Sequence, residues 1–541
     1  MDRMEPVDLN AAADAYAATP LLNCLLREAA EPVAPAAAAH DAGPAAGVHA
    51  AAPYEEAAHG TAVHRLLGSG RMLRVRGGRR PERPEVRTAD GWHLLDHSEL
   101  VKLVADELRQ YTGVPNGELP VEITDSRDTV AALLAARATA DAPADPYVLS
   151  EQSLVMGHPH HPAPKARGGA PAGSWLPYAP EAHARFPLVF LGVREDQVAE
   201  EGGRAAATAL DSLADALDGP RPPAGYRLLP AHPWQLDLVG SRTPVREALA
   251  DGRLLHLGPS RLPAWPTASI RTLYVPGQAD LFVKFSLDVR ITNDVRRLWR
   301  HDLLKLRRTD AAVEAGFAAL RHAGSPAAWL GDRGYRTAGF AFEELAVLVR
   351  DGLHDAHAHT LPGATPLLAA ALAEGHDGGP TVGGGDPAGW WRAYLRQVVA
   401  PVLELFARHG IVLEAHLQNT LIAVGADGLP VQALFRDAEG VKLLPDAGRA
   451  AAWQRLVYCL VVNNLAEMAG ALSHRHPDIS ALLWPAVREE FLRYDATRGL
   501  PEIAELLSAP SLPAKTNLLL RWTGADGADA RYLPLPNPLR G

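Results

Sequence analysis

The clearest alternation of apolar and polar side chains runs from residue 281 to residue 290 and predicts a β-strand. Alternate positions there are occupied by apolar residues, namely Leu281, Val283, Phe285, Leu287 and Val289. Successive side chains of a strand point to opposite faces. We therefore expect a half-buried strand whose polar face carries Lys284, Asp288 and Arg290.

The residues after this strand predict an anion site. Thr292, Asn293 and Asp294 favour a helix N-cap, so a helix is expected to begin at Val295 with Arg296 in its first turn. A preceding strand adds further donors from Ser269, Arg271 and Thr272. A helix N-terminus beside such cations suits a polyanion such as a nucleoside triphosphate or a polycarboxylate. The alternative is a salt-bridged strand on a solvated surface.

Similar patterns predict the other elements. Helices are expected at 8–31, 96–112, 126–141, 197–218, 390–410 and 450–472. Strand-like sequence occurs at 60–95, 185–193, 226–230, 420–424 and 431–436. The Ala/Pro/Gly-rich tract 31–53 is expected to be a loose connection, and the Gly-rich segment 375–390 a mobile loop at a domain boundary.

Composition narrows the class of protein. The 541 residues are 47% hydrophobic and 21% charged, as in ordinary globular proteins, and the net charge of −10 argues against nucleic acid or an anionic membrane as the main partner. Only two cysteines occur, Cys24 and Cys459, without metal-ligand spacing. With no secretory signal and no uncharged stretch long enough for a bilayer, we expect a cytoplasmic protein.

The loop GHPHHPAPKARGG, residues 157–169, carries several basic groups. Its prolines and glycines predict a rigid loop that displays them, namely His158, His160, His161, Lys165 and Arg167. Zinc binding is disfavoured because helical or CxxC ligand spacing is missing. Contact with phosphate is the better interpretation.

A second motif, EAHLQN at 414–419, is followed by Asp437. Together, Glu414, Asn419 and Asp437 could hold Mg²⁺ against phosphate oxygens, with His416 on the substrate. The structural alternative is that the carboxylates pair with local arginines such as Arg436. The order and spacing of His, Asn and Asp in this motif also resemble a kinase-like catalytic loop, but no Gly-rich loop and lysine precede it in the usual order.

Taken in order, these motifs resemble the IucA/IucC family of NRPS-independent siderophore synthetases. The matching segments are SEQSLVMGHPHHPAPKARGG, LLPAHPWQ, ASIRTLYV, KFSLDVRITNDVRRL and LEAHLQNTLI with LFRDAEG, and the C-terminal part looks like an FhuF-like region. The resemblance implies an α+β, cupped-hand architecture with mixed antiparallel sheets, usually as a homodimer. It divides the chain into a thumb (1–144), fingers (145–385) and a helical palm (386–541).

The family also implies a reaction. ATP adenylates a carboxylate of citrate or a related acid and releases pyrophosphate; an amine or alcohol then displaces AMP and forms an amide or ester. The implied ATP contacts are His161, Lys165, Arg167, Ser269, Arg271, Thr272, Lys284, Asn419 and Asp437. The implied citrate contacts are Thr292, Arg296 and His416, and the implied Mg²⁺ ligands are Glu414, Asn419 and Asp437. Arg296, His416 and Lys284 are expected to be catalytic.

Some alternatives stay open at this point. The N-terminal LLNCLLREAAEP and the basic loop look most like type A enzymes, which use free citrate, whereas type C enzymes take a citryl or succinyl-hydroxamate intermediate. His160 stands where an apolar residue is frequent. A kinase-like small-molecule phosphotransferase and a non-catalytic binder of ferric siderophore or citrate are the competing classes. Two distant cysteines cannot supply the iron–sulfur ligands of FhuF reductases.

Overall fold

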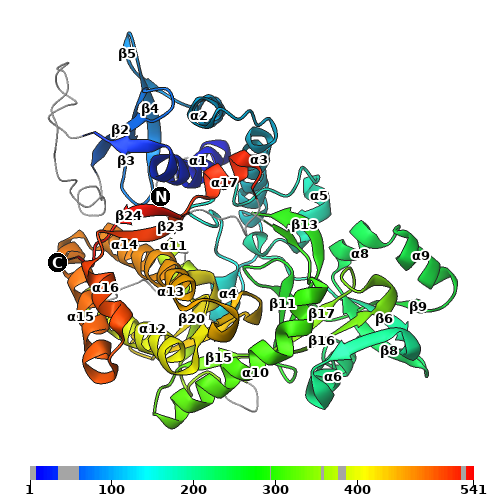
Figure 1. The fold of residues 1–541 in the computed structure, drawn as a ribbon. Coiled ribbons are helices and arrows are strands. Elements are labelled where there is room, and N and C mark those ends of the chain that lie inside the picture. Colours follow the sequence, from blue (N-terminus) through cyan, green and yellow to red (C-terminus); the bar gives the residue numbers. More distant parts are fainter. Residues whose placement is uncertain are drawn as a thin grey trace, which may run out of the picture.

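The computed structural model describes residues 8–33, 60–292, 294–354, 359–375, 385–525 and 532–540, and it has an α+β fold (Figure 1). The N-terminal part, at the top of Figure 1, joins three helices to a five-stranded antiparallel sheet. Its helices are α1 (Leu9–Glu28), α2 (His97–Thr112) and α3 (Glu118–Arg137). Its strands are β1 (Ala30–Pro32), β2 (Thr61–Leu66), β3 (Met72–Arg76), β4 (Glu82–Thr88) and β5 (Gly91–Leu94).

The central part is built on antiparallel strands. A six-stranded sheet has the order β10 (Trp265–Pro266), β11 (Thr272–Val275), β12 (Leu281–Phe285), β17 (Val347–Asp351), β16 (Asp332–Ala338) and β7 (Val198–Glu201). A three-stranded sheet beside it contains β8 (Tyr226–Ala231), β6 (Val189–Arg194) and β9 (Leu254–Pro259). Short helices around these sheets are α4 (Pro146–Glu151), α5 (Ala172–Trp175), α6 (Gly203–Asp211), α7 (Leu213–Ala216), α8 (Pro233–Val239) and α9 (Thr243–Ala250).

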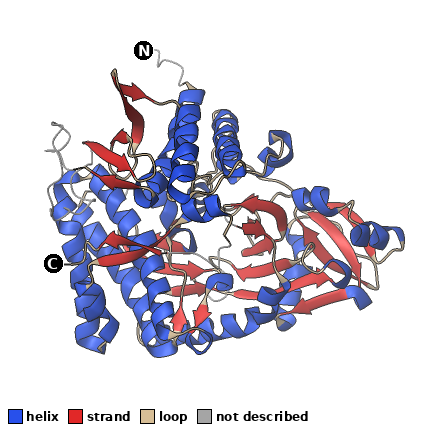
Figure 2. Ribbon diagram, turned by 45° about the horizontal axis from the view of Figure 1, so that its top comes forward, coloured by secondary structure: helices blue, strands red, loops and turns tan. Residues whose placement is uncertain are grey.

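The C-terminal part is mainly helical and lies on the left in Figure 2. Its sheet has the order β15 (Ala328–Leu330), β21 (Pro430–Arg436), β20 (Thr420–Val424) and β18 (Thr365–Leu368), and only the β15–β21 pair is parallel. Two small pairs are β19 (Ile411–Val412) with β22 (Lys442–Leu443) and β23 (Ser511–Lys515) with β24 (Tyr532–Pro536). The helices are α10 (Arg300–His322), α11 (Ala369–Glu374), α12 (Pro387–His409), α13 (Arg449–Val457), α14 (Ala466–Arg475), α15 (Ser480–Arg498), α16 (Pro501–Ser508) and α17 (Asn517–Thr523).

A wide, π-helical stretch, Tyr458–Leu465, joins α13 to α14. The continuous stretch Arg449–Arg475 is long and apolar enough to cross a membrane, but 78% of its most apolar window is buried inside the protein. A stretch buried by its neighbours in this way is the core of a helical layer.

The predicted strand at 281–290 is wrong in its extent. The chain divides it into β12, whose side chains are all buried, and β13 (Leu287–Ile291), which pairs with β14 (Asp294–Arg296). Because β12 lies between β11 and β17 and is covered on both faces, Lys284 is only 3% exposed rather than on a solvated face.

The helix predicted from Val295 is also wrong, because it begins at Arg300. Thr292 has a positive φ of 60°, so the chain turns back as a hairpin instead of capping a helix. Arg296 therefore lies in strand β14 and not at a helix N-terminus. Asn293, most of the tract 31–53 and residues 376–384 lie outside the described residues.

Most of the other expected elements are present. Helix 8–31 corresponds to α1, the β region at 60–95 to β2–β5, and the helix that ends before Gly410 to α12. Two differ in detail: α3 begins earlier, at Glu118, and segment 197–218 holds β7 before its helices.

Candidate functional site

A cavity of about 600 Å³ opens where β11, β12, the β13–β14 hairpin, the basic loop 157–169 and the segments 414–419 and 437–440 meet. All the predicted site residues line it except His161, which is buried in its loop. The sequence motifs thus converge in space although the chain separates them by up to 280 residues or so, because antiparallel pairing brings them to one place.

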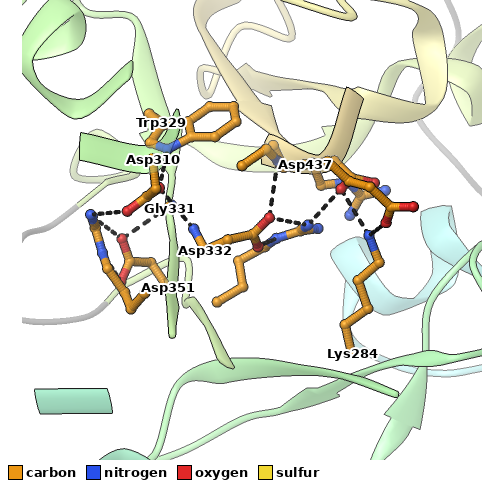
Figure 3. A network of polar contacts seen from close by, with 12 residues as sticks. Lys284, Asp310, Trp329, Gly331, Asp332, Asp351 and Asp437 are labelled. Carbon is orange, nitrogen blue, oxygen red and sulfur yellow. Dashed lines mark hydrogen bonds and ion pairs between the residues drawn. The ribbon is translucent and has the colours of Figure 1, made fainter. Parts of the chain in front are cut away.

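Lys284 is the centre of the best-ordered part of this cavity. Its Nζ donates hydrogen bonds to Asp437 Oδ1 and to Glu439 Oε2, both at 2.8 Å (Figure 3). Arg271 donates to Glu439 Oε2 at 3.3 Å and to the Arg296 carbonyl at 2.9 Å. Cross-strand pairing puts Thr272 directly opposite Lys284, and Ser269 precedes this strand with its carbonyl accepting from the Thr272 amide at 2.7 Å.

Both carboxylates of this group are ionised. Burial alone would raise the pKa of Asp437, but the charges of Lys284 and Arg350 hold it well below its ordinary value. Burial would likewise raise the pKa of Glu439, and Lys284 and Arg271 lower it. The group is therefore an internally balanced set of charges at neutral pH.

Asp437 has an unusual backbone that buried contacts hold in place. Its φ is 81° and its ψ is 88°, a region that few residues other than glycine adopt. Asp332, which is fully buried, accepts a hydrogen bond from the Ala438 amide at 2.9 Å and from Arg350 Nε at 2.6 Å. Arg350 in turn lies 3.3 Å from Asp437 Oδ1, and Asp310 accepts from the Asp332 amide at 3.0 Å (Figure 3).

Arg296 lies at a second position in the cavity and has a different environment. Its Nη2 donates to the Ile291 carbonyl at 2.7 Å and to Thr292 Oγ1 at 2.5 Å. Within the part of the chain that the structure describes, it makes no ion pair. Burial, and then the charge of Arg271, lower the pKa of Arg296 to about 10. A guanidinium in this state is stabilised by a bound anion.

His416 begins the short turn Leu417–Asn419 and lines the same cavity. Burial lowers its pKa to about 4, so the imidazole is neutral at pH 7. The buried Asn464 of the π-helical stretch holds its segment, since Asn464 Nδ2 donates to the Ala415 carbonyl at 2.8 Å. The next residue of that stretch toward the N-terminus, Asn463, lines the cavity itself.

The three predicted Mg²⁺ ligands line the cavity but are not equivalent. Glu414 is paired with Arg455, so the ion-pair alternative holds for this carboxylate, although with a different arginine from Arg436. Arg436 is buried against Glu151. Asn419 and Asp437 remain beside the cavity, and Glu439 supplies a second carboxylate there. No cluster of three His, Cys, Asp or Glu side chains that could hold a metal occurs among the residues described.

The expectation that loop 157–169 displays its basic groups is wrong for four of the five, His160, His161, Lys165 and Arg167. Lys165 and Arg167 are 6% and 3% exposed, and they share Glu181, with Lys165 Nζ in direct contact and Arg167 Nη2 at 3.6 Å. The loop folds inward because Ser126 and Asp125 of α3 accept hydrogen bonds from its backbone at Lys165 and Arg167. His161, only 2% exposed, is packed inside it.

The unusual His160 of this loop makes a link between distant parts. Its Nε2 lies 2.8 Å from Arg27 Nη2 of α1 and 2.9 Å from Glu467 Oε1 of α14. Burial lowers the pKa of His160, and Arg27 lowers it further. The contact fastens the N-terminal helix and the loop to the helical part behind the cavity.

Sequence reasoning missed several residues of the cavity. Glu439 could have been found, because it follows Asp437 by two residues in FRDAEG. Two others that line the cavity, Arg350 and Asp302, could not have been found, because their positions depend on strand pairing and on where α10 begins. The same holds for Asp332, which lies outside the lining and supports Arg350.

Comparison with known proteins gives a consistent result. The family profile described as "IucA / IucC family" matches residues 146–374, and the one described as "Ferric iron reductase FhuF-like transporter" matches residues 388–530. The rhizobactin siderophore biosynthesis protein RhbC of Rhizobium meliloti is 30% identical over 453 residues, which cover 73% of this chain and 75% of that protein. The L-2,3-diaminopropanoate–citrate ligase of Staphylococcus aureus is 29% identical and covers 74% of this chain and 76% of its own.

Solved structures agree over nearly the whole length. ATP-bound aerobactin synthetase IucA of Klebsiella pneumoniae matches 97% of this chain and 99% of its own with a TM-score of 0.78 at 23% identity. The petrobactin biosynthesis protein AsbB of Bacillus anthracis matches 98% and 96% with a TM-score of 0.74 at 17% identity. The expected α+β architecture is thereby confirmed, whereas the division at residues 144 and 385 stays a prediction.

Proposed function

Because this chain belongs to the IucA/IucC family of siderophore synthetases, we propose that it is an ATP-dependent ligase of siderophore assembly that condenses citrate with an amine. Its relatives include a diaminopropanoate–citrate ligase and the spermidine–citrate ligase of Bacillus anthracis, which supports free citrate, the type A substrate. We place the enzyme in the cytoplasm; a homodimer remains a prediction.

The observation that carries the proposal is the presence of two distinct cationic positions in one cavity. Lys284 and Arg271 form one, and Arg296 with Thr292 forms the other. An enzyme that joins two anions must neutralise both before a carboxylate oxygen can approach the α-phosphorus. We assign the phosphates of ATP to the Lys284 position and a carboxylate of citrate to Arg296.

The proposed reaction has two displacements. A citrate oxygen forms a bond to the α-phosphorus of ATP, the bond to the bridging oxygen breaks, and pyrophosphate leaves with the electron pair. The amine nitrogen then bonds to the acyl carbon, the bond from that carbon to AMP breaks, and a neutral amine loses one proton. We assign the neutral His416 to citrate or the acyl group; its position in the lining of the same cavity supports this.

Mg²⁺ fits the donors at the Lys284 position. Carboxylates and amide oxygens are its preferred protein ligands, and Asp437, Glu439 and Asn419 supply them. When bound there, the ion neutralises phosphate charge. Two of the predicted ligands are already in ion pairs, Glu414 with Arg455 and Asp437 with Lys284 and Arg350, so the metal would have to share them.

The first test is the stoichiometry of the products. Mg-ATP is supplied with citrate, succinate or 2-oxoglutarate, and with hydroxylamine as a surrogate nucleophile. We expect pyrophosphate and AMP with citrate only. If none of the three acids gives pyrophosphate, the protein is a type C enzyme or a non-catalytic binder. If ADP is formed, it is a phosphotransferase. Either result overturns the proposal.

A further inference from the structure

A second, smaller cavity of about 430 Å³ adjoins the first and shares Asp302, Glu439 and Lys442 with it. The two cavities are therefore adjacent, and we call the region of the three shared residues, between the first turn of α10, which carries Asp302, and the turn Ala438–Gly440, the neck. We call the smaller cavity the side groove. Nothing in the reaction proposed above occupies it.

The side groove differs from the main cavity in its lining. Its walls include the apolar side chains of Leu298, Leu306, Leu348 and Val441. At its outer end lie Lys305 and the ion pair of Arg308 with Asp446. A groove with apolar walls and polar ends suits a molecule with a short aliphatic chain between polar groups.

The carboxylates at the neck favour a positively charged molecule in the side groove. Glu439 already shares its charge with Lys284 and Arg271. Asp302 does not, because its ion-pair partner in the described ranges is the exposed His301 at 3.4 Å. Burial, and then the charge of Glu439, raise the pKa of Asp302. The charges of His301, Lys305 and Lys442 act on this pKa in the opposite direction, but neither lysine forms an ion pair with Asp302 among the described residues. A carboxylate without a lysine or arginine partner attracts an organic cation.

We propose that the side groove is the binding site for the amine substrate, with Asp302 holding an amino group at the neck and the aliphatic chain lying along the apolar walls. This inference rests on the function proposed above. The neck places the amino group beside the cavity that holds Arg296, where the acyl-adenylate would be formed.

The test separates the two half-reactions. Citrate-dependent exchange of pyrophosphate into ATP reports adenylation alone, and hydroxylamine reports capture by a small nucleophile. L-2,3-diaminopropanoate, ornithine and spermidine serve as amines, each measured as a substrate and as an inhibitor of the hydroxylamine reaction. In Asp302→Asn we expect the KM, or the inhibition constant, of the effective amine to rise about tenfold or more. The exchange reaction should change far less.

A second variant tests the groove itself. Thr309 lines the groove from α10, and Thr309→Trp should narrow it and weaken the amines while hydroxylamine still reacts. Leu304→Trp is the matched control, because Leu304 lies on the same helix, is 56% exposed and does not line the groove. Its kinetics should equal those of the wild type.

Three outcomes would overturn the inference. One is a loss of citrate or ATP affinity in Asp302→Asn that equals its loss of amine affinity. Another is unchanged amine constants in both Asp302→Asn and Thr309→Trp. The third is the failure of every amine in the panel to react or to inhibit in the wild type. Absence of citrate-dependent exchange in the wild type would instead contradict the proposed function. Failure of the amine site and failure of the proposed function are therefore distinguishable.

Discussion

The two cationic positions of the main cavity differ in how the protein balances their charge. At the Lys284 position, Asp437 and Glu439 accept from the ammonium group, and Asp332 accepts from the Ala438 amide beside Asp437 (Figure 3). Arg350 lies 3.3 Å from Asp437 Oδ1. At the Arg296 position, the guanidinium donates to a carbonyl and a hydroxyl oxygen and makes no ion pair with any residue that the structure describes. The first position is therefore complete before any ligand arrives, whereas the second is completed by an anion. The same contrast predicts which substitutions harm the fold and which harm only the chemistry.

The largest loss of stability is expected when a buried carboxylate that supports the Lys284 position is removed. Asp332→Ala leaves Arg350 and the Ala438 amide without their buried acceptor. Breaking a buried ion pair in this way costs about 3–5 kcal/mol, so urea unfolding should show a stability loss of that size together with weakened ATP binding.

The control for this loss is Arg296→Ala, which removes no ion pair among the described residues and should change the free energy of unfolding by only about 1 kcal/mol, because hydrogen bonds alone are lost. Equal destabilisation in the two variants would remove the distinction between the positions.

Arg296→Ala should instead act on the carboxylate substrate. Loss of a charge-assisted contact made by this half-buried guanidinium lowers kcat/KM for citrate about a hundredfold, or roughly 2.7 kcal/mol. Calorimetry should find the affinity for Mg-ATP much less affected. Arg296→Lys keeps the charge but loses the bidentate geometry, and it should recover part of the activity. A parallel loss of ATP affinity would move Arg296 to the phosphate site.

Lys284→Met tests the phosphate assignment with little change in side-chain volume. The variant leaves Asp437 and Glu439 facing the phosphates without the ammonium group. We expect the Kd of Mg-ATP, measured by calorimetry, to rise about tenfold to thirtyfold. Citrate dependence should change less than in Arg296→Ala. Unchanged ATP affinity would contradict the role given to Lys284.

The smallest effect is expected from His416, through its titration. Its pKa is about 4 in the folded chain and about 6.5 when unfolded. Between those values the unfolded state binds the extra proton, so stability falls as pH falls from about 6.5 toward 4.

His416→Gln removes this contribution. It should therefore lose less stability than the wild type between pH 7 and 5, by about 1 kcal/mol because the side chain is partly exposed. Urea unfolding at both pH values measures this. Identical pH slopes in wild type and variant would show that His416 is not held neutral by burial.

Much of this molecule could be predicted from local sequence. Helix α12 follows from apolar spacing and ends where Gly410 adopts a φ of 63°, and the alternation at 420–436 gives the β20–β21 hairpin. The sequence also predicted that the site residues belong to one site, because the motifs carry charged groups of compatible chemistry. All of these residues except His161 do line one cavity.

The parts that could not be predicted depend on contacts between distant segments. Alternation from 281 to 290 is continuous, but β12 and β13 pair with different partners and belong to different sheets. The burial of Lys165 and Arg167 depends on Glu181, which lies in a segment without any recognisable pattern. Asp302 likewise reaches the neck only because α10 begins at Arg300.

Because the stretch Tyr458–Leu465 is π-helical, the number of residues between α13 and α14 decides which side chains face the main cavity. It lies between α13 and α14, and Asn463 and Glu467 both line the main cavity. Each residue of an α-helix turns the chain by about 100°, and a π-helical turn holds one residue more than an α-helical turn. Inserting one residue here would rotate Glu467, and with it the contact to His160, away from the cavity, whereas deleting one residue can be absorbed by a change from a π-helical to an α-helical turn. Insertions in this helix should therefore be excluded during evolution even where substitutions are accepted, and a single deletion should be tolerated better than a single insertion.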